Sequence, residues 1–567
     1  MSTTLHGPQR SLPSQQAQRQ PVRVADQLVR CLERADVKLA LGLPGGSISP
    51  LFDALMDSSI RTIITRHENG AVFAAAAYAR QLERPAVVLL TSGPGVLNCT
   101  AALASASADG VPMVILAGEV ARSQQGRMVL QDGSAHALDV RGSLRALAKR
   151  VIEVPEPSAA MPILQGALQL CMSGRPGPVV LLLPVDVLRA HVPEGQTFEL
   201  THPTPAPLNP LLLRSVAHTL QHSERVAIIA GSGCRWGDGP ALLERLATRL
   251  GAPVVTTPKA KGVLPESHPA HRGVLGIGGH TSADAVFAQP VQTLLALGTS
   301  MGDLATHGWW SNLQPTSDFI QVDVDETRLG RTYPPSYALA CTVEAFLRAL
   351  LPRLNPQPPR APSLPIQRHP DTTCEGLHPG RAIAAIQRLL PPTTVYAVDS
   401  GEHCFFALHY LHIDQPDGFL SMLGLGSMGS GISGALGLKL AQPGRTVACI
   451  CGDGGMLMSL GEISTAVQHG LGVVWFVFND GALGMVQHGH RSLYRRTPSF
   501  ELGGADFAQA ARALGARGFT ARTVQDLLDL ELNLQRGPVV VDVLIDGTVQ
   551  MPKGSRLAVL GHQEEPK

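Results

Sequence analysis

Short apolar runs alternate with longer amphipathic or alanine-rich segments along most of the 567-residue chain. The runs 446–451 (TVACIC) and 473–478 (VVWFVF) are typical of buried strands in a parallel sheet, and the segment between them predicts a crossover helix. The same rhythm occurs in three separate parts of the chain. The pattern therefore predicts an α/β protein with three doubly wound parallel-sheet domains.

Two proline-rich stretches, 191–210 and 352–370, interrupt this rhythm. Because proline lacks a backbone donor and resists helix formation, we expect extended connectors there. They divide the chain into expected domains at 21–190, 205–350 and 375–550, with a disordered tail at 1–20 and a second tail at 551–567. An organelle-targeting peptide is the alternative interpretation of the first tail.

The composition narrows the class of protein. A formal net charge of +1 gives no electrostatic support for a nucleic acid or an anionic membrane as a partner. The nine cysteines have neither metal-type spacing nor the framework of a secreted domain, which favours a reduced, cytoplasmic protein. Since no apolar run reaches the ~20 residues of a membrane span, we expect a soluble chain.

Acidic side chains follow two neighbouring predicted strands. Asp453 lies in a glycine-aspartate-glycine turn after the first strand, and Asp480 follows the second. The carboxyl ends of parallel strands meet at one sheet edge, where a glycine turn entering a helix offers free N–H groups to an anion. The stretch predicts a metal-diphosphate site. The alternative is an ordinary βαβ unit whose Gly and Asp only form turns.

Two further features are less specific. Glu68 follows a short predicted strand and begins an alanine-rich helix that we expect to end near Arg80, and stabilisation by the helix dipole alone would explain a carboxylate there. We also expect the segment 174–187 to form a strand that ends the first sheet. The middle unit has a Rossmann-like outline without a full dinucleotide fingerprint.

Together these segments resemble the thiamine diphosphate (ThDP) enzyme superfamily, in its acetolactate-synthase-like branch with pyruvate oxidase and benzoylformate decarboxylase. The matching segments occur in the family's order at 41–55, 65–80, 91–98, 174–187, 261–279, 398–407, 424–447 and 451–485. The resemblance implies a pyrimidine-binding domain first, a central domain, and a diphosphate-binding domain last.

The resemblance also implies ThDP and Mg²⁺ as cofactors. Asp453, Asp480 and the backbone carbonyl of Ala482 would bind Mg²⁺, an ion that prefers oxygen ligands and shares them with phosphates. The diphosphate would contact His403 and the turn that contains Gly452, Gly454 and Gly455. Many members of the family have Asn at the position of Asp480, so this chain carries an extra negative charge, which His403 and the backbone N–H groups would have to offset.

The resemblance assigns catalytic roles to three residues. Glu68 would hydrogen-bond the aminopyrimidine ring, the backbone carbonyl of Gly426 would accept a hydrogen bond from the exocyclic amine, and Met428 would hold the two cofactor rings bent. In the family, Glu68 and the diphosphate site meet across two protomers. We therefore expect a homodimer or a dimer of dimers.

The expected function is ThDP- and Mg²⁺-dependent decarboxylation or cleavage of a pyruvate-like 2-oxo acid, with transfer of the resulting acyl carbanion to an unknown acceptor. Such an enzyme is a lyase or carboligase. Three alternatives stay open: a true acetolactate synthase, a decarboxylase of the benzoylformate decarboxylase type, and a non-catalytic ThDP-binding paralogue.

The expected substrate pocket departs from an ordinary acetolactate synthase. Its residues would be Gly45, Ala135, His136, Met485 and Gly489. Ala135 and His136 replace a Phe-Gln pair, Gly489 replaces a Trp, and Ser300 stands where the family keeps an Arg that binds a carboxylate. These changes predict an acceptor without a carboxylate, unless Lys259 or Lys261 replaces the missing Arg. Because Ser300 occupies the position of a basic residue, FAD is possible but undecided.

Overall fold

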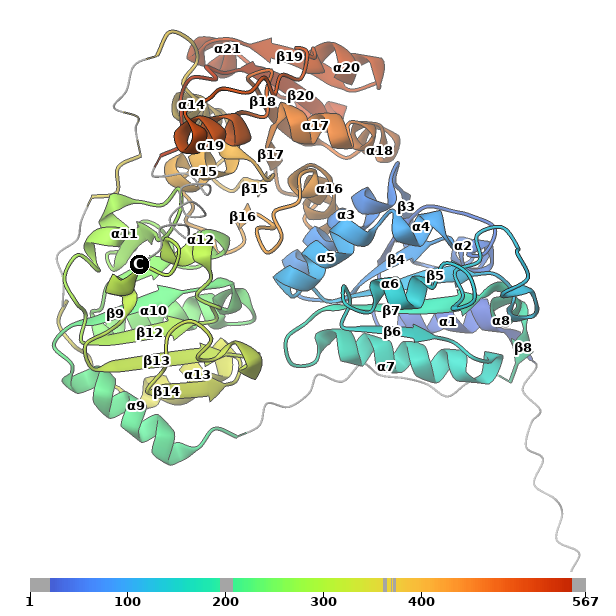
Figure 1. The fold of residues 1–567 in the computed structure, drawn as a ribbon, viewed down its shortest axis with the longest axis horizontal. Coiled ribbons are helices and arrows are strands. Elements are labelled where there is room, and N and C mark those ends of the chain that lie inside the picture. The colour runs from blue at the N-terminus through green and yellow to red at the C-terminus, as the bar shows by residue number, and fades with distance from the viewer. Residues whose placement is uncertain (1–20, 194–206, 360–364, 369, 371–373, 553–567) are drawn as a thin grey trace, which may run out of the picture.

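The structure is a computed structural model that describes residues 21–193, 207–359, 365–368, 370 and 374–552 (Figure 1). The expected tail at 1–20, and the tail at 551–567 apart from its first two residues, lie outside the described residues. Three six-stranded sheets form, each from strands that are parallel to their neighbours. The predicted fold class, with three doubly wound α/β domains, is confirmed.

The N-terminal domain has the strand order β3-β2-β4-β5-β7-β6. Its elements are β1 (Val22–Arg23), α1 (Val24–Arg34), β2 (Leu39–Gly42), α2 (Ser49–Met56), β3 (Arg61–Ile64), α3 (Glu68–Leu82), β4 (Ala86–Leu90), α4 (Pro94–Leu97), α5 (Thr100–Asp109), β5 (Met113–Glu119), α6 (Val140–Leu144), β6 (Arg150–Glu153), α7 (Ala160–Met172), β7 (Pro178–Pro184), α8 (Val185–Arg189) and β8 (His191–Val192).

Two expectations for this domain were wrong in detail. The apolar strand β7 does not end the sheet, because the less buried β6 pairs with its outer side. The stretch 191–210 begins with strand β8, which pairs antiparallel with β1 through Val22 and Val192, so residues 191 and 192 belong to the N-terminal domain and not to the connector.

The central domain has the strand order β11-β10-β9-β12-β13-β14. Its elements are α9 (Pro210–His222), β9 (Val226–Ala230), α10 (Gly239–Leu250), β10 (Val254–Thr256), β11 (His271–Val274), α11 (Thr281–Ala285), β12 (Thr293–Leu297), α12 (Asp303–Thr306), β13 (Asp318–Asp323), β14 (Tyr337–Ala340) and α13 (Val343–Leu350). The apolar strands β9 and β12 lie in the middle of the sheet and are buried on both faces, as parallel strands between two helical layers are.

The C-terminal domain has the strand order β16-β15-β17-β18-β20-β19. Its elements are α14 (Pro379–Leu389), β15 (Val395–Val398), α15 (Glu402–Tyr410), β16 (Phe419–Leu420), α16 (Ser430–Ala441), β17 (Val447–Gly452), α17 (Asp453–Ser459), α18 (Gly461–His469), β18 (Val473–Asn479), α19 (Gly484–Tyr494), α20 (Phe507–Ala513), β19 (Arg517–Ala521), α21 (Val524–Leu528) and β20 (Val539–Leu544). The two predicted strands, β17 and β18, are adjacent and parallel. The single crossover helix expected between them is divided into α17 and α18, which meet at Leu460.

Helices α3 and α16 join the first and last domains in one apolar core that contains Ala74, Ile432 and Trp475. A Cβ atom on Gly437 of α16 would lie only 1.9 Å from the carbonyl oxygen of Ala74, so the two helices approach at backbone distance. Small residues on both helices permit this contact. The alanine-rich sequence of α3 is therefore explained by interdomain packing.

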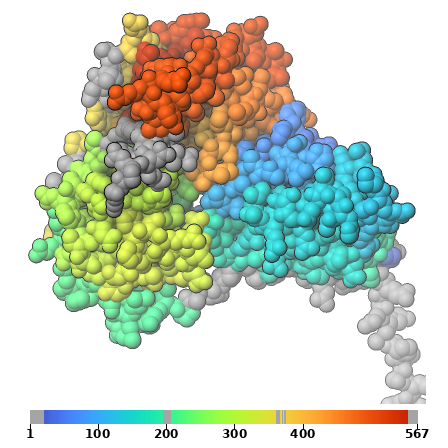
Figure 2. Space-filling model, viewed as in Figure 1, coloured from blue at the N-terminus to red at the C-terminus, as the bar shows by residue number. Residues whose placement is uncertain are grey.

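Asp109, at the end of α5, connects all three domains. Its carboxylate accepts hydrogen bonds from Lys259 Nζ of the central domain (3.1 Å) and from the backbone N–H of Gly424 in the C-terminal domain (3.3 Å). Figure 2 shows the resulting shape, in which the C-terminal domain (orange and red) touches both other domains. Over the described ranges, no helix is both long and apolar enough to cross a membrane.

Candidate functional site

The two aspartates singled out in the sequence lie at the same edge of the C-terminal sheet. Asp453 begins α17 directly after β17, and Asp480 directly follows β18. The two strands are paired in parallel up to Gly452 and Phe478, so their carboxyl ends are neighbours. Asp453 is buried and Asp480 is half-buried.

The surroundings of Asp453 favour the binding of a cation. Its Oδ1 accepts a hydrogen bond from the Gly454 N–H (2.7 Å), whereas its Oδ2 is buried and has no hydrogen-bond partner among the described residues. Burial and the nearby Asp480 raise the pKa of Asp453 to about 7, and burial also raises the pKa of Asp480. A buried carboxylate with an unpaired oxygen and a like-charged neighbour is costly unless a cation binds.

These residues fit Mg²⁺ bound together with a diphosphate. No group of three His, Cys, Asp or Glu side chains in the described part of the chain could hold a metal ion. Two carboxylates would therefore need further oxygen ligands, such as a backbone carbonyl and phosphate oxygens, which is the usual environment of protein-bound Mg²⁺. Ala482, two residues after Asp480, donates its N–H to the Asp480 Oδ1 (3.3 Å), so its carbonyl belongs to the same turn.

The glycine turn at the start of α17 is enclosed by the other expected cofactor residues. A Cβ atom on Gly452 would lie 3.0 Å from His403 Nδ1, and one on Gly454 would lie 3.0 Å from Met428 Cε. A Cβ atom on Gly455 would lie 2.3 Å from the carboxylate of Asp399. The structure thus gathers His403, Met428 and the turn at one place in the C-terminal domain.

Burial favours the neutral form of the His403 imidazole, which lies on α15. Its Nε2 donates a hydrogen bond to the backbone carbonyl of Asp399 (3.0 Å), and burial lowers the pKa of His403 to about 4. Its Nδ1, which faces Gly452, therefore carries no proton and can only accept. Whether His403 offsets the extra negative charge of Asp480 beside a bound diphosphate stays a prediction.

Asp399 was missed from the sequence, although it lies in the matching segment 398–407. It is completely buried, with a pKa raised by burial to about 6, and accepts hydrogen bonds from the N–H groups of Gly429 and Gly431, both at 2.9 Å. These bonds hold the turn that carries Met428 and Gly426, whose φ of +76° favours glycine. Its position directly after the apolar strand β15 was the signal that could have indicated it.

Glu68 begins α3 and is buried in the N-terminal domain. Its Oε2 accepts a hydrogen bond from the Asn98 side-chain amide (3.0 Å), and Gly95 and Cys99 lie next to it. All three neighbours belong to the segment after β4. Asn98 is the second residue that sequence reasoning missed, because nothing in its local pattern shows that it faces Glu68.

The expected substrate-pocket residues are divided between distant places. Met485 and Gly489 lie on α19, whereas Ala135 and His136 are exposed in the loop before α6. Figure 1 shows α19 and α6 well separated in one chain. Gly45 packs against Thr91, whose Oγ1 would lie 2.3 Å from a Cβ atom at that position. A single chain therefore does not bring the five residues together.

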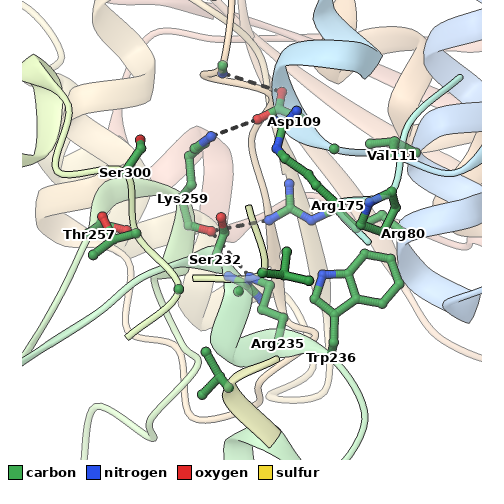
Figure 3. Close-up of a pocket in the computed structure, with 18 of the residues that line it drawn as sticks. Arg80, Asp109, Val111, Arg175, Ser232, Arg235, Trp236, Thr257, Lys259 and Ser300 are labelled. Carbon is green, nitrogen blue, oxygen red and sulfur yellow. Dashed lines mark hydrogen bonds and ion pairs between the residues drawn. The ribbon is translucent and has the colours of Figure 1, made fainter. Parts of the chain in front are cut away.

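Ser300 and Lys259 line a different feature, a cavity of about 540 Å³ where the three domains meet (Figure 3). It lies at the carboxyl ends of β9, β12 and β13. We call it the interdomain pocket. It differs from the site around Asp453, whose residues do not line it.

Three arginines that line the interdomain pocket bring positive charge to it. Arg175 donates hydrogen bonds to the carbonyls of Ser107 and Ala108, and Arg80 and Arg235 both donate to the carbonyl of Lys259. None of the three has a carboxylate ion-pair partner within the ranges that the structure describes. Their charge makes the pocket suitable for an anionic ligand.

Lys261 does not reach this pocket. Its Nζ is fully buried and forms an ion pair with Glu266 at 2.5 Å. Of the two lysines considered as replacements for the missing arginine, the structure therefore leaves only Lys259, which is itself paired with Asp109.

Comparisons with known proteins agree with this architecture. Three family models match in order: the N-terminal thiamine pyrophosphate (TPP) binding domain of TPP enzymes at 22–138, their central domain at 213–350, and their C-terminal TPP binding domain at 399–543. The aspartate pair lies within the last of these, and Glu68 within the first.

Full-length relatives give the same result. A Mycobacterium tuberculosis chain whose name refers to an acetolactate synthase large subunit, IlvB2, is 32% identical over 93% of this chain and 99% of its own length. The large subunit of Escherichia coli acetolactate synthase isozyme 1 is 30% identical over 92% of this chain and 94% of its own. The fold and the site define a diphosphate-binding α/β enzyme. The chain belongs to the thiamine pyrophosphate enzyme family, in its acetolactate-synthase-like branch.

Proposed function

We propose that this protein uses ThDP and Mg²⁺ to decarboxylate or cleave a pyruvate-like 2-oxo acid and to transfer the acyl unit to an acceptor. The observation that carries the metal site is the buried Oδ2 of Asp453, which lies beside Asp480 and has no hydrogen-bond partner in the described part of the chain. We propose a cytoplasmic location from the cysteines, all nine of which are free. A non-catalytic paralogue would have no chemical need for this metal site or for a buried Glu68.

When bound, ThDP supplies the thiazolium chemistry that releases CO₂ from a 2-oxo acid and stabilises the acyl carbanion. The chain's own residues would hold and orient it. Asp453, Asp480 and the Ala482 carbonyl would bind the metal, and the N–H groups of the turn would bind the diphosphate. Asp399 would keep Gly426 and Met428 at the cofactor rings by fixing their turn. Glu68 would hydrogen-bond the pyrimidine ring.

A second copy of the chain would complete this site. The neighbours of Glu68 lie in the N-terminal domain, whereas the metal and ring-binding residues lie in the C-terminal domain. Large apolar side chains beside the ring-binding turn and on α17 are exposed: Leu425 (50%), Leu457 (42%) and Met458 (68%). Exposed apolar side chains so near the site favour coverage by another protein surface, which here would be the N-terminal domain of a partner.

Complementation tests the shared site. Co-expression of Glu68→Gln and Asp453→Ala chains with different tags gives mixed dimers, each with one intact site if Glu68 and Asp453 act in trans. We expect the mixture to recover about a quarter of wild-type activity, since half of the randomly paired dimers are mixed. No recovery in purified mixed dimers would contradict the shared site.

For the acceptor, we propose an aldehyde or another carbonyl without a carboxylate, or simply a proton. Ser300 cannot bind a carboxylate bidentately, and the small Gly489 on α19 leaves room where the family has an indole. Acetolactate synthase itself is the second candidate. The names of the relatives favour it, as do the cationic groups in the interdomain pocket.

One assay separates these candidates. The protein is incubated with ThDP, Mg²⁺ and a panel of 2-oxo acids, with and without aldehydes, and CO₂ and products are identified. We expect hydroxyketones only when an aldehyde is present. Efficient acetolactate formation from pyruvate alone, at a rate near the ~10 s⁻¹ median of enzymes, would favour the second candidate.

FAD is the remaining cofactor question. The interdomain pocket has a volume within the ~300–1,000 Å³ of typical ligand sites, and its arginines suit the phosphates of a dinucleotide. We propose that FAD binds in this pocket. Flavin fluorescence titration tests this, and we expect Arg175→Ala to weaken binding. Lack of binding by the wild-type protein would contradict the proposal without affecting the ThDP site.

A further inference from the structure

A buried ion pair lies beside the proposed metal site and has no part in the catalytic roles proposed so far. His488, on α19, donates a hydrogen bond from Nδ1 to the carboxylate of Glu402 at the start of α15, at 2.9 Å from Oε2 and 3.1 Å from Oε1. The two side chains are only 7% and 12% exposed. They are 86 residues apart in the sequence, so the pair exists only in the folded chain.

The hydrogen bonds of His488 determine its charge. Nδ1 faces a carboxylate, and Nε2 lies 3.0 Å from the backbone carbonyl of Gly547. A carbonyl and an ionised carboxylate can only accept, so beside an ionised Glu402 both ring nitrogens carry a proton and the ring is an imidazolium. The bond to Glu402 accordingly raises the pKa of His488 above its ordinary value.

Glu402 ties a third segment to the same place. Its Oε1 also accepts a hydrogen bond from the backbone N–H of Met551 at 2.8 Å. Together with the Gly547 bond to His488, this fixes the chain after β20 to α15 and α19. That segment lies against the metal site, because a Cβ atom on Gly547 would be 3.0 Å from Asp480 Cβ.

Glu402 and Asp480 face a common point at the start of α19. A Cβ atom on Gly484 would lie 2.4 Å from Asp480 Oδ2 and 3.6 Å from Glu402 Oε2. We call the three carboxylates of Asp453, Asp480 and Glu402 the acidic corner. A bound diphosphate would add further negative charge there, whereas burial disfavours a charged His403. The imidazolium of His488 therefore supplies a second cation to this corner, next to Glu402, in addition to the proposed Mg²⁺.

We propose that His488 is a positioning residue that neutralises Glu402 and, through Glu402 and Gly547, holds α19 and the segment 546–551 against the diphosphate end of the cofactor. The proposal rests on the proposed Mg²⁺-ThDP site. In this role His488 leaves Asp480 free to bind the metal. It also places Met485 and Gly489, which lie within one turn of it on α19.

The test uses the full-length protein and three variants: His488→Gln, Glu402→Gln and the double variant. ThDP binding is measured by calorimetry at saturating Mg²⁺, independently of activity. We expect His488→Gln to weaken binding roughly 10- to 30-fold, because it leaves Glu402 buried and unpaired beside Asp480. Glu402→Gln should stay within about threefold of wild type, and the double variant should recover most of the loss.

A control and a second readout separate this role from general stability. His490→Gln removes a ring on the same helix that hydrogen-bonds the carbonyl of Arg496 (3.1 Å) and packs against Tyr494 and Phe500, and we expect it to leave binding unchanged. Limited trypsin digestion should cut α19 at Arg491 faster in His488→Gln than in His490→Gln. Recovery in the double variant would not follow from a packing role of the imidazole, since that variant lacks it too.

Three results would overturn the proposal: ThDP binding by His488→Gln within about twofold of wild type, a double variant as weak as His488→Gln, or a loss beyond about tenfold in Glu402→Gln alone. If His488→Gln does not fold, the Glu402→Gln and double variants decide. If wild-type protein fails to bind ThDP with Mg²⁺, the proposed function fails instead, and the two failures are thereby distinguished.

Discussion

Two carboxylates begin two helices at the carboxyl ends of parallel strands, yet their surroundings suit different chemistry. Glu68 begins α3 after β3, and Asp453 begins α17 after β17. The helix dipole favours a negative charge equally in both places. Glu68 has a neutral amide donor, Asn98, whereas Asp453 has a second carboxylate nearby and a buried oxygen without a partner among the described residues.

This difference explains why one carboxylate suits a hydrogen bond to a cofactor ring and the other suits a metal. An amide donor stabilises a single carboxylate and leaves its second oxygen available to a ring that carries a proton. A second carboxylate instead raises the cost of the first charge until a cation binds. The side chain contributed by another element, rather than the helix start itself, decides the chemistry.

The largest expected effect is on catalysis, from Glu68→Gln. An amide cannot stabilise a protonated ring nitrogen, and positioned proton transfer contributes ~10² to 10⁴ in rate, so we expect a loss of that size with ThDP binding retained. Hydrogen-deuterium exchange at C2 of bound ThDP measures the step directly. Unchanged exchange in the variant would show that Glu68 has another role.

Asp453→Ala should act in the opposite way to Glu68→Gln. We expect it to weaken cofactor binding itself, rather than the rate of the enzyme with cofactor bound. Removal of a metal ligand should cost more than the ~10- to 100-fold that loss of outer-shell groups costs, so we expect metal-dependent ThDP affinity to fall over 100-fold. ThDP titration at fixed Mg²⁺ measures it. Tight binding by this variant would remove the basis for the metal site.

Asn98→Asp gives Glu68 a neighbouring carboxylate, as Asp453 has in Asp480. It places a second carboxylate at hydrogen-bond distance from Glu68, and such a pair retains a proton that one carboxylate alone would release. We expect a roughly 10- to 100-fold lower rate at neutral pH. Asn98→Ser serves as a neutral control, and equal rates in the two variants would show that the charge next to Glu68 is unimportant.

The affinity of the Asp453 site for Mg²⁺-ThDP should also depend on pH. Because burial and Asp480 raise the pKa of Asp453 to about 7, its carboxylate is largely ionised at pH 8 and largely protonated at pH 6 in the metal-free protein. Protons then compete with Mg²⁺, so the apparent affinity for Mg²⁺-ThDP should fall about tenfold from pH 8 to pH 6. Calorimetry at both values checks this, with Asp480→Asn as the variant in which the drop should be smaller.

Asp480→Asn should have the smallest effect. It replaces the carboxylate next to Asp453 with an amide, so that Asp453 has an amide neighbour as Glu68 has. The amide oxygen can still bind Mg²⁺. We expect a change in ThDP affinity of about fivefold or less, well below that of Asp453→Ala. Equal losses in the two variants would mean that the two aspartates do not differ as metal ligands.

Much of this protein was determined by local sequence. Apolar runs such as Val473–Asn479 specify buried strands because side chains on both faces of a parallel strand must leave water. Asp453 and Asp480 could be placed at one edge because neighbouring parallel strands end on the same side. Short family motifs likewise indicated Glu68, Gly426 and Met428, because each of these residues lies in a contiguous segment with a recognisable pattern.

Only the tertiary structure decided which side chains from distant elements meet. It paired Glu402 with His488, placed Asn98 against Glu68, and buried Lys261 with Glu266 away from the interdomain pocket. Local periodicity specifies which face of an element is apolar, but not which polar groups of other elements lie against it. Their charges and hydrogen bonds depend on that packing, because burial removes the water that would otherwise make each group independent of its neighbours.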